Sequence, residues 1–505
     1  MTTYARLLLL LLACISLFDA PAVAQEAQKV RRATTWETHQ LRAGSAFATP
    51  VHVQDTGKPG PTVLIVSGLH GDEPASAYAA DQVRHWPLLN GRLVVVPRAN
   101  EPALRAGKRL TPGVSKAVSN ANRNFPLAKE KSDAPARGEL AQALWALLRS
   151  ERPQWVLDLH EGFDVHKRNP KSVGRTIIVA RDKTAIAMAD KMLADVNATI
   201  RDPKVQFERL TSPIDGSLAR AAATHAGARA MILETATKGL AVSSRARQMR
   251  ILVHRCLREL KMLGPNVKAS DIGYRKGVRA KTVIGVYDGG GTGGSGVARL
   301  LLQLPKLSGV AVARIGPTEI KAGALNDLDA VVFSGGMGGA QSRFLGADGR
   351  ASVRRFVKDG GGYVGICAGA YLACKGFKWG LGILDARTKP GNWRRGKGTV
   401  QMQLTKGGRA LLADRPAPFG VLYANGPILA PANADDVPDY ETLATYNSEL
   451  ALNGSKPGIM VGSPAAVRGR FGKGRVICFG PHPEQTKGLH DLVRRAARWA
   501  VEGDN

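Results

Sequence analysis

Cysteine is scarce in this chain, with five in 505 residues. None falls in a C-x-x-C pair, so the usual cysteine pattern of a structural zinc site is excluded. Cys14 lies in an N-terminal leader, and the remaining Cys256, Cys367, Cys374 and Cys478 are too few for a disulfide framework. If Cys367 and Cys374 share a helix, they lie roughly 10 Å apart, whereas a disulfide needs Cα atoms within ~7 Å. We therefore expect free thiols.

Long apolar runs are absent after the N-terminus. No internal stretch reaches the ~20 apolar residues of a transmembrane helix, so no stable membrane span is predicted. The N-terminus combines Arg6, an apolar run over 7–18 and the small-residue site Ala22-Val23-Ala24. This is the pattern of a secretory signal peptide, and the run is too short for an anchor. Lipid modification of Cys14 is a weaker alternative. We expect residues 1–24 to be removed and the chain to be exported to a bacterial periplasm.

Acidic residues are outnumbered, 41 against 71 lysines and arginines, for a net charge of +30. A basic surface attracts acidic partners, and an anionic cell-wall polymer is a candidate in an exported protein. An arginine-rich genome explains the same balance without a partner. Because the basic residues are scattered and aromatic residues make up only 6% of the chain, we predict no nucleic-acid partner.

Apolar runs of strand length alternate with helical patterns along most of the chain, which predicts an α/β fold. A chain of this length exceeds a single core. The polar, basic stretch over 266–281 has the composition of a linker. We therefore predict one domain over 45–265 and a second over 282–502. The predicted strands are 62–66, 93–96, 155–159, 176–180, 231–233, 282–287, 330–333, 363–366 and 475–479.

The first domain contains a set of metal-ligating residue types. GLHGDEP (68–74) follows an apolar strand and holds His70 and Glu73, and His160 ends the strand in WVLDLHEG. Two histidines and a glutamate are a common ligand set of catalytic zinc. Glu234, at the end of another strand, is a candidate general base. The alternatives are a polar turn, a core histidine and a structural ion pair, but strand ends are where open α/β sheets bind ligands.

Five motifs in order resemble the succinylglutamate desuccinylase/aspartoacylase branch of the zinc carboxypeptidase superfamily over about residues 45–260. They are GLHGDEP, PRAN (97–100), ANRNFP (121–126), LDLHEG (157–162) and GSLARAAATHAGARAMILET (216–235). The resemblance implies a mixed sheet with covering helices. It also implies that His70, Glu73 and His160 bind Zn²⁺ and that Glu234 is the general base and proton shuttle.

The segment NRNFP adds the polar pair Asn122 and Arg123, which suits a substrate carboxylate. The resemblance implies that this pair clamps that carboxylate. It implies Arg105 or Arg109 as the group that polarises the scissile carbonyl, without deciding between them. The family usually has an aspartate where Asn120 stands, a departure that bears on the orientation of the clamp.

The second domain contains a candidate nucleophile. In GGGYVGICAGAYLAC (360–374) an apolar strand leads through Cys367 into a helical pattern, as in a nucleophile elbow. GPHPEQ (480–485) adds His482 and Glu484, which complete the residue types of a nucleophile, base and orienting acid. FSGGMGG (333–339) offers backbone N–H groups for an oxyanion. The alternative is a small buried residue at a tight turn.

GICAG and HPE in order resemble the class I glutamine amidotransferase-like superfamily over about residues 282–500. VYDGGGTGGSG (286–296) points to the branch similar to the N-terminal domain of biotin–protein ligases. The resemblance implies a flavodoxin-like fold and a Cys367, His482 and Glu484 triad. The glycine-rich stretch lacks the order of a phosphate-binding P-loop. We expect a strand-to-helix loop there, with Ser295 as the helix N-cap.

Together these features predict an exported zinc-dependent hydrolase. Its substrate is an N-acyl amino acid or small peptide that carries a carboxylate, and the activity of the attached second domain stays open. One alternative is a carboxypeptidase or amidase of peptidoglycan fragments. Another, of a different class, is a binding protein whose sites are catalytically silent.

Overall fold

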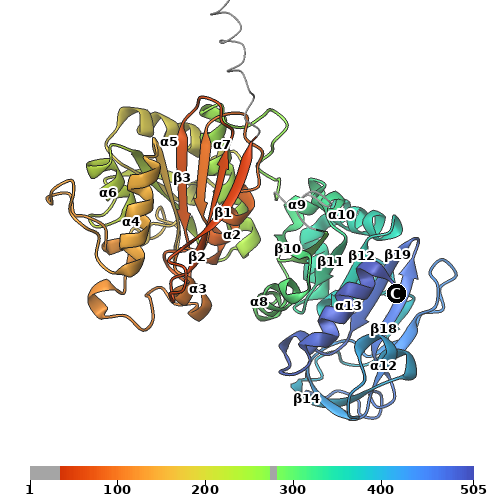
Figure 1. The fold of residues 1–505 in the computed structure, drawn as a ribbon. Helices are drawn as coiled ribbons and strands as arrows, with labels where there is room; N and C mark the ends of the chain where they lie inside the picture. The colour runs from red at the N-terminus through yellow and green to blue at the C-terminus, as the bar shows by residue number, and fades with distance from the viewer. Residues whose placement is uncertain (1–33, 273–280, 505) are drawn as a thin grey trace, which may run out of the picture.

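The structure is a computed structural model and describes residues 34–272 and 281–504. The predicted signal peptide, residues 1–24, lies outside the described residues, as do residues 273–280 of the predicted linker. The chain forms two α/β units, each built on one large sheet (Figure 1). Across the described ranges, no helix combines the length and the apolar character needed to cross a bilayer.

The sheet of the first unit has eight strands in the order β1-β2-β4-β3-β5-β8-β6-β7. Strands β4, β3, β5 and β8 run parallel in its centre, β2, β6 and β7 run in the opposite direction, and β1 pairs antiparallel with β2. This confirms the mixed sheet. The strands are β1 (Thr35–Leu41), β2 (Thr49–Asp55), β3 (Thr62–Ser67), β4 (Arg92–Val96), β5 (Trp155–Gly162), β6 (Thr176–Val179), β7 (Glu208–Thr211) and β8 (Arg229–Ala236). Strand β1 lies almost wholly exposed at an edge, so no apolar pattern indicated it in the sequence.

Helices cover both faces of this sheet (Figure 1). One core packs against α2 (Pro74–Val83), α5 (Lys183–Asn197) and α7 (Val242–Glu259), and the other against α4 (Glu139–Glu151) and α6 (Leu218–His225). The short α3 (Glu101–Ala106) follows β4. All eight residues of β5 are buried, as expected for a central parallel strand. Its polar residues Asp158, His160 and Glu161 therefore need partners inside the protein.

The second sheet has nine strands in the order β10-β9-β11-β12-β19-β18-β17-β14-β15. Its five parallel strands follow the flavodoxin-like order, 2-1-3-4-5 in chain sequence, which confirms the predicted fold. The remaining four extend it antiparallel. The strands are β9 (Thr282–Tyr287), β10 (Val310–Ile315), β11 (Ala330–Phe333), β12 (Gly362–Ile366), β14 (Lys397–Leu404), β15 (Phe419–Ala424), β17 (Glu441–Tyr446), β18 (Pro464–Phe471) and β19 (Gly474–Phe479), and β13 (Ala386–Thr388) pairs separately with β16 (Leu429–Pro431).

Helices again pack on both faces. One core includes residues of α8 (Gly294–Gln303), α12 (Lys406–Leu412) and α13 (His490–Glu502). The other includes α9 (Pro317–Lys321), α10 (Gly338–Lys358) and α11 (Ala368–Ala373). Cys256, Cys367, Cys374 and Cys478 are all buried free thiols, as predicted.

The predicted N-cap of α8 is wrong. The helix begins at Gly294 with Gly293 as its N-cap, so Ser295 lies inside the first turn. The Ser295 hydroxyl donates instead to Oε1 of Gln485, 3.0 Å away. Glycine is itself a common N-cap because its backbone adopts the extended cap conformation freely, and the helix therefore starts before the serine.

Candidate functional site

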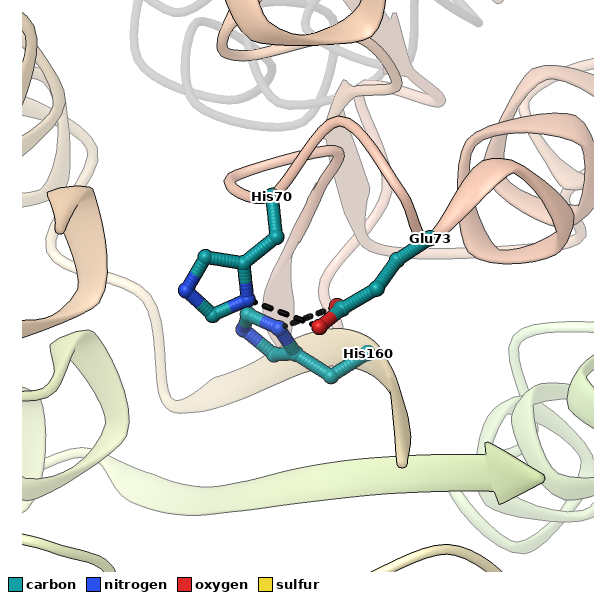
Figure 2. Close-up of side chains that lie close together, drawn as sticks. All are labelled: His70, Glu73 and His160. Carbon is teal, nitrogen blue, oxygen red and sulfur yellow. Dashed lines mark hydrogen bonds and ion pairs between the residues drawn. The ribbon is translucent and has the colours of Figure 1, made fainter. Parts of the chain in front are cut away.

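His70, Glu73 and His160 meet at the carboxyl ends of β3 and β5. Their ligand atoms lie within 4.8 Å of one another, and all three residues are buried. Figure 2 shows both imidazoles directed at the Glu73 carboxylate. Nδ1 of His70 lies 2.8 Å from Oε1, and Nδ1 of His160 lies 2.8 Å from Oε2. Two nitrogen atoms and one oxygen atom that can bind a metal thus converge on one point. His70 and Glu73 come from the turn after β3, and His160 comes from the neighbouring strand β5.

The local chain path explains how His70 and Glu73 reach that point. After β3 the chain turns at Gly68, whose φ of 72° favours glycine. Gly71 packs against the end of α3, where a Cβ atom would lie 1.8 Å from the carbonyl oxygen of Ala103. Glu73 is the N-cap residue of α2, with proline at the first helical position. The two side chains therefore leave a turn held tightly between β3 and two helices.

The outer nitrogens of both rings also have partners. Nε2 of His70 lies 3.1 Å from Oδ1 of Asn120, and Nε2 of His160 lies 2.9 Å from Oδ1 of Asp158. An acceptor on Nε2 keeps the proton there and leaves the Nδ1 lone pair for a metal, which is the usual outer shell of metal-bound histidine. The donor types and their support fit zinc. Asn120, where the family usually has an aspartate, thus contacts the candidate ligand His70.

The carboxylates and imidazoles of the cluster shift one another's pKa values. Burial alone would raise the pKa of Glu73, but the imidazoles of His70 and His160 hold it well below its usual value. Burial would lower the pKa of His160, but the carboxylates of Asp158 and Glu73 raise it well above its usual value. The carboxylates therefore favour a positive charge at this point, which a divalent cation supplies in place of protons.

Glu234 lies beside His160 because β8 pairs with β5 in a register that places these two residues opposite each other. Burial raises the pKa of Glu234 well above its usual value, against the opposing effect of His160. Its Oε2 has no hydrogen-bond partner among the described residues. Glu73 and Glu234 both line a cavity of about 580 Å³, with Arg109, Phe163 and Lys171 among the other lining residues. A buried carboxyl group with a free oxygen thus faces the space next to the donor cluster.

The structure separates the two candidate arginines. Nη1 of Arg109 lies 2.6 Å from Oε1 of Glu73 and the residue lines the cavity. Arg105 points away, with a side chain 79% exposed and paired to Glu101. Arg123 is close enough to the site that burial and Arg109 lower its pKa, while Glu234 opposes that shift. Arg109 and Arg123 therefore provide positive charge at this site, and Arg105 does not.

The side chain of Asn122 is committed to partners inside the protein. Its Nδ2 donates to Oδ2 of Asp158 over 3.0 Å, and its Oδ1 accepts from the backbone N–H of Leu218 over 2.9 Å. These contacts place Asn122 behind His160 rather than in the cavity. Of the predicted carboxylate clamp, Arg123 is the member whose charge reaches the site.

Glu161 and Arg245, like Asp158, are charged residues near this site that were not singled out from the sequence. Glu161 accepts the backbone N–H of Ala75 over 2.6 Å, donates its own N–H to Oε2 of Glu73 over 3.1 Å, and forms a buried ion pair with Arg245. Glu161 stands in an otherwise apolar strand, and a charge in a buried strand must be paired. That pattern could have indicated it, but nothing local to Arg245 indicated its partner 84 residues away.

Cys367 lies in the second unit, between the end of β12 and the start of α11. Its φ of 50° and ψ of −100° are rare for a residue with a side chain, and such strain is typical of a nucleophile elbow. Nδ1 of His482 lies 2.8 Å from Oε1 of Glu484. Burial lowers the pKa of His482, but hydrogen bonds to Cys367 and Glu484 raise it to about 10. Cys367 and His482 line a cavity of about 250 Å³. Gly335 lines it too, and a Cβ atom on Gly335 would lie 2.5 Å from the His482 ring.

Two protein-family models match this chain, one in each of the two units. Residues 59–260 match the succinylglutamate desuccinylase/aspartoacylase catalytic domain, and residues 282–388 match the N-terminal domain of biotin-protein ligase. A curated relative is the N-alpha-acetyl-L-2,4-diaminobutyric acid deacetylase of Halomonas elongata, 33% identical over 123 residues, which are 24% of this chain and 34% of the relative. An uncharacterized protein of Chlamydia muridarum is 29% identical over 30% of this chain and 60% of its own. The chain thus spans about a third of the first relative and less than two thirds of the second.

Solved structures similar to the chain include the apo form of the cell shape determinant protein Csd4 from Helicobacter pylori. It is 20% identical with a TM-score of 0.35, and the match covers 47% of this chain and 58% of that one. A succinylglutamate desuccinylase/aspartoacylase from Rhodobacter sphaeroides is 17% identical with a TM-score of 0.33, over 46% and 68% of the two chains. By the family models, residues 59–260 are similar to the succinylglutamate desuccinylase/aspartoacylase catalytic domain, and residues 282–388 are similar to the biotin-protein ligase N-terminal domain.

Proposed function

We propose that the first domain is a zinc-dependent hydrolase that cleaves an amide bond in an N-acyl amino acid or small peptide carrying a carboxylate. The observation that supports this is the buried donor cluster of His70, Glu73 and His160, which adjoins Glu234 at a cavity. The family match supports a hydrolase that acts on amide bonds. The deacetylase name of one relative favours the N-acyl amino acid over the peptide.

In this proposal His70, Glu73 and His160 hold zinc. When bound, zinc would act as a Lewis acid that lowers the pKa of a bound water to about 7 and polarises a carbonyl. Glu234 takes the proton of the attacking water and delivers it to the leaving amine. A nearby dication lowers the pKa that burial raises, so the carboxylate form becomes available as a base. Arg109 stabilises the negative charge that develops on the carbonyl oxygen, and Arg123 binds the substrate carboxylate.

The outer residues keep this arrangement in place. Asp158 holds Nε2 of His160 and is itself held by Asn122, while Asn120 holds Nε2 of His70. Such outer partners orient the ligands and tune their basicity, and their loss typically costs about 10- to 100-fold in metal affinity or activity. We therefore assign Asn122 to orientation of His160 and the carboxylate clamp to Arg123.

Metal removal tests the proposal. We expect about one zinc per chain by elemental analysis, loss of amide hydrolysis after a chelator, and recovery on adding zinc back, because the reacting water depends on the metal. The assay uses a panel of N-acyl amino acids and peptidoglycan stem peptides. Protein that binds no zinc and hydrolyses neither class would instead favour the binding protein with silent sites.

The same panel separates the two enzymatic alternatives. Hydrolysis of stem peptides without hydrolysis of N-acyl amino acids would favour the peptidoglycan-fragment carboxypeptidase or amidase. The relatives named above give no support to an anionic cell-wall polymer as a partner. We also propose export, on the pattern of residues 1–24, which predicts Gln25 as the first residue of the mature chain by N-terminal sequencing.

For the second domain we propose covalent chemistry at Cys367, with His482 as base and Glu484 as the acid that orients it. The strained backbone of Cys367 and the Nδ1–Oε1 contact between His482 and Glu484 support these roles. The substrate of this site belongs to the amide class that cysteine nucleophiles attack, because the sulfur needs an electrophilic carbonyl.

Cys367→Ala should leave the zinc-dependent hydrolysis within about twofold of wild type, because Cys367 belongs to the core of the second unit and none of its contacts reaches the donor cluster. Steady-state kinetics on the best amide substrate provides the measurement. A collapse of that activity in folded Cys367→Ala protein would show that the cysteine acts in the same reaction.

A further inference from the structure

The two units meet through α2 and α7 of the first and through β10, α9 and Asp288 of the second. Arg250 of α7 and Glu319 of α9 form an ion pair of 2.6 Å, with side chains only 1% and 3% exposed. Gln82 of α2 donates to the carbonyl of Arg314 over 3.3 Å, and the Arg314 guanidinium lies 4.0 Å from the centroid of the Tyr78 ring. Charged groups this well buried stay paired only if the two surfaces keep one arrangement.

The N-terminus of α7 is capped across this contact. Its own N-cap residue, Ala241, supplies no side-chain hydrogen bond. Asp288, which follows β9 in the second unit, accepts the backbone N–H of Ser243 at Oδ2 over 3.3 Å, and its carbonyl accepts the Ser243 hydroxyl. The first N–H groups of a helix lack partners within the helix, and a carboxylate there is favourable to the helix dipole. The second unit thus completes a helix of the first.

From this cap a continuous set of contacts leads to the donor cluster. Arg245, two residues after Ser243, forms the buried ion pair with Glu161. Glu161 in turn accepts the N–H of Ala75 and donates its own N–H to Oε2 of Glu73. Glu161 thus contacts both the first turn of α2, which follows Glu73, and the Glu73 carboxylate. Among the described residues its only ion-pair partner is Arg245, which comes from the capped turn.

We propose that Asp288 of the second domain is a positioning residue for the metal site of the first domain. By capping α7 it holds Arg245 against Glu161, and Glu161 holds the Glu73 carboxylate at the point that both imidazoles face. The inference rests on the proposed function, because it concerns the zinc site. It gives the second domain a part in the first reaction that does not require turnover at Cys367.

The glycine-rich loop that begins at Asp288 connects the domain contact to the second site. Farther along the chain, Gly293 at the end of the loop and Ser295 in the first turn of α8 line the Cys367 cavity. Gly291 is held against α10, where a Cβ atom would lie 2.4 Å from the backbone nitrogen of Gln341. One short loop, packed too closely for larger residues, therefore borders the domain contact at one end and the second site at the other.

The test measures zinc affinity in the full-length protein by competition with a chelator of known affinity. Asp288→Ala should raise the zinc dissociation constant about 3- to 10-fold, which lies within the roughly 2- to 30-fold change in an equilibrium constant that the loss of a helix cap produces. At saturating zinc, kcat should return to within about twofold of wild type, because the ligands and Glu234 are unchanged. A merely structural loss would instead lower the active fraction at every zinc concentration.

The matched control is Glu319→Gln, which weakens the Arg250 ion pair of the same domain contact, leaves Asp288 and Ser243 unchanged, and should leave the zinc dissociation constant at the wild-type value. Should Asp288→Ala fail to fold, Ser243→Ala removes the hydroxyl contact to the Asp288 carbonyl while it keeps the N–H bond to the Asp288 carboxylate and the Asp288 and Arg314 pair, and at least a twofold weaker zinc affinity is expected. Unchanged affinity in the folded variant, or an equal change in the control, overturns the inference. Wild-type protein that binds no zinc overturns the proposed function and the inference with it.

Discussion

Glu234→Gln should lower amide hydrolysis by about a thousandfold while zinc remains bound, within the 10²- to 10⁴-fold that a positioned acid–base group contributes. The amide keeps the size of the side chain but cannot accept the proton of the attacking water. The metal stays because Glu234 is not among the three clustered donors. In free-energy terms the loss corresponds to about 4 kcal/mol of transition-state stabilisation.

Two measurements establish that result: kcat/KM on the best amide substrate, and zinc content by elemental analysis of the same preparation. The control variant is Glu101→Gln, which changes an acid of the same domain that pairs with Arg98 and Arg105 outside the cavity. It should keep near-normal kinetics. Turnover in Glu234→Gln within tenfold of wild type would remove Glu234 from the role of base.

His70→Gln should release zinc and abolish hydrolysis. His70 supplies one of three donors, so we expect zinc affinity to fall by more than the ~100-fold upper range for loss of an outer partner. His70 suits this test better than His160, because its outer partner Asn120 is neutral. Removing His160 would leave the buried carboxylates of Asp158 and Glu73 without their shared imidazole, which endangers folding.

Zinc stoichiometry after dialysis, together with the thermal unfolding midpoint, provides the measurement. Asn120→Ala is the milder variant for comparison, because it keeps His70 and removes only the acceptor on its Nε2. It should weaken zinc binding about 10- to 100-fold and leave the fold intact. If His70→Gln retained one tightly bound zinc per chain, the ligand assignment would be wrong.

Much of the fold could be predicted from local patterns. The buried strands β3, β5 and β9 coincide with apolar runs, and a period near 3.6 marked α4 and α7. These elements depend on neighbours in the chain, so their patterns are visible without tertiary structure. Edge strand β1 was missed because an exposed strand needs no apolar face.

The candidate site was predictable in part for a related reason. His70, Glu73, His160 and Glu234 all stand at or just after the ends of parallel strands, and such ends meet at one edge of a sheet. The residue types and their order were therefore enough to suggest a common site. The structure brings these four together.

Tertiary structure alone decided the contacts that join distant segments. It placed Asn120 on His70, turned Arg109 toward Glu73 and Arg105 away, and enclosed Asn122 among internal partners. The pairing of Asp288 with Ser243 crosses two domains. Local sequence records the chemistry of each side chain and the periodicity of its element. Which side chains meet depends on how sheets and helices pack, and that packing is set by contacts between residues far apart in the chain.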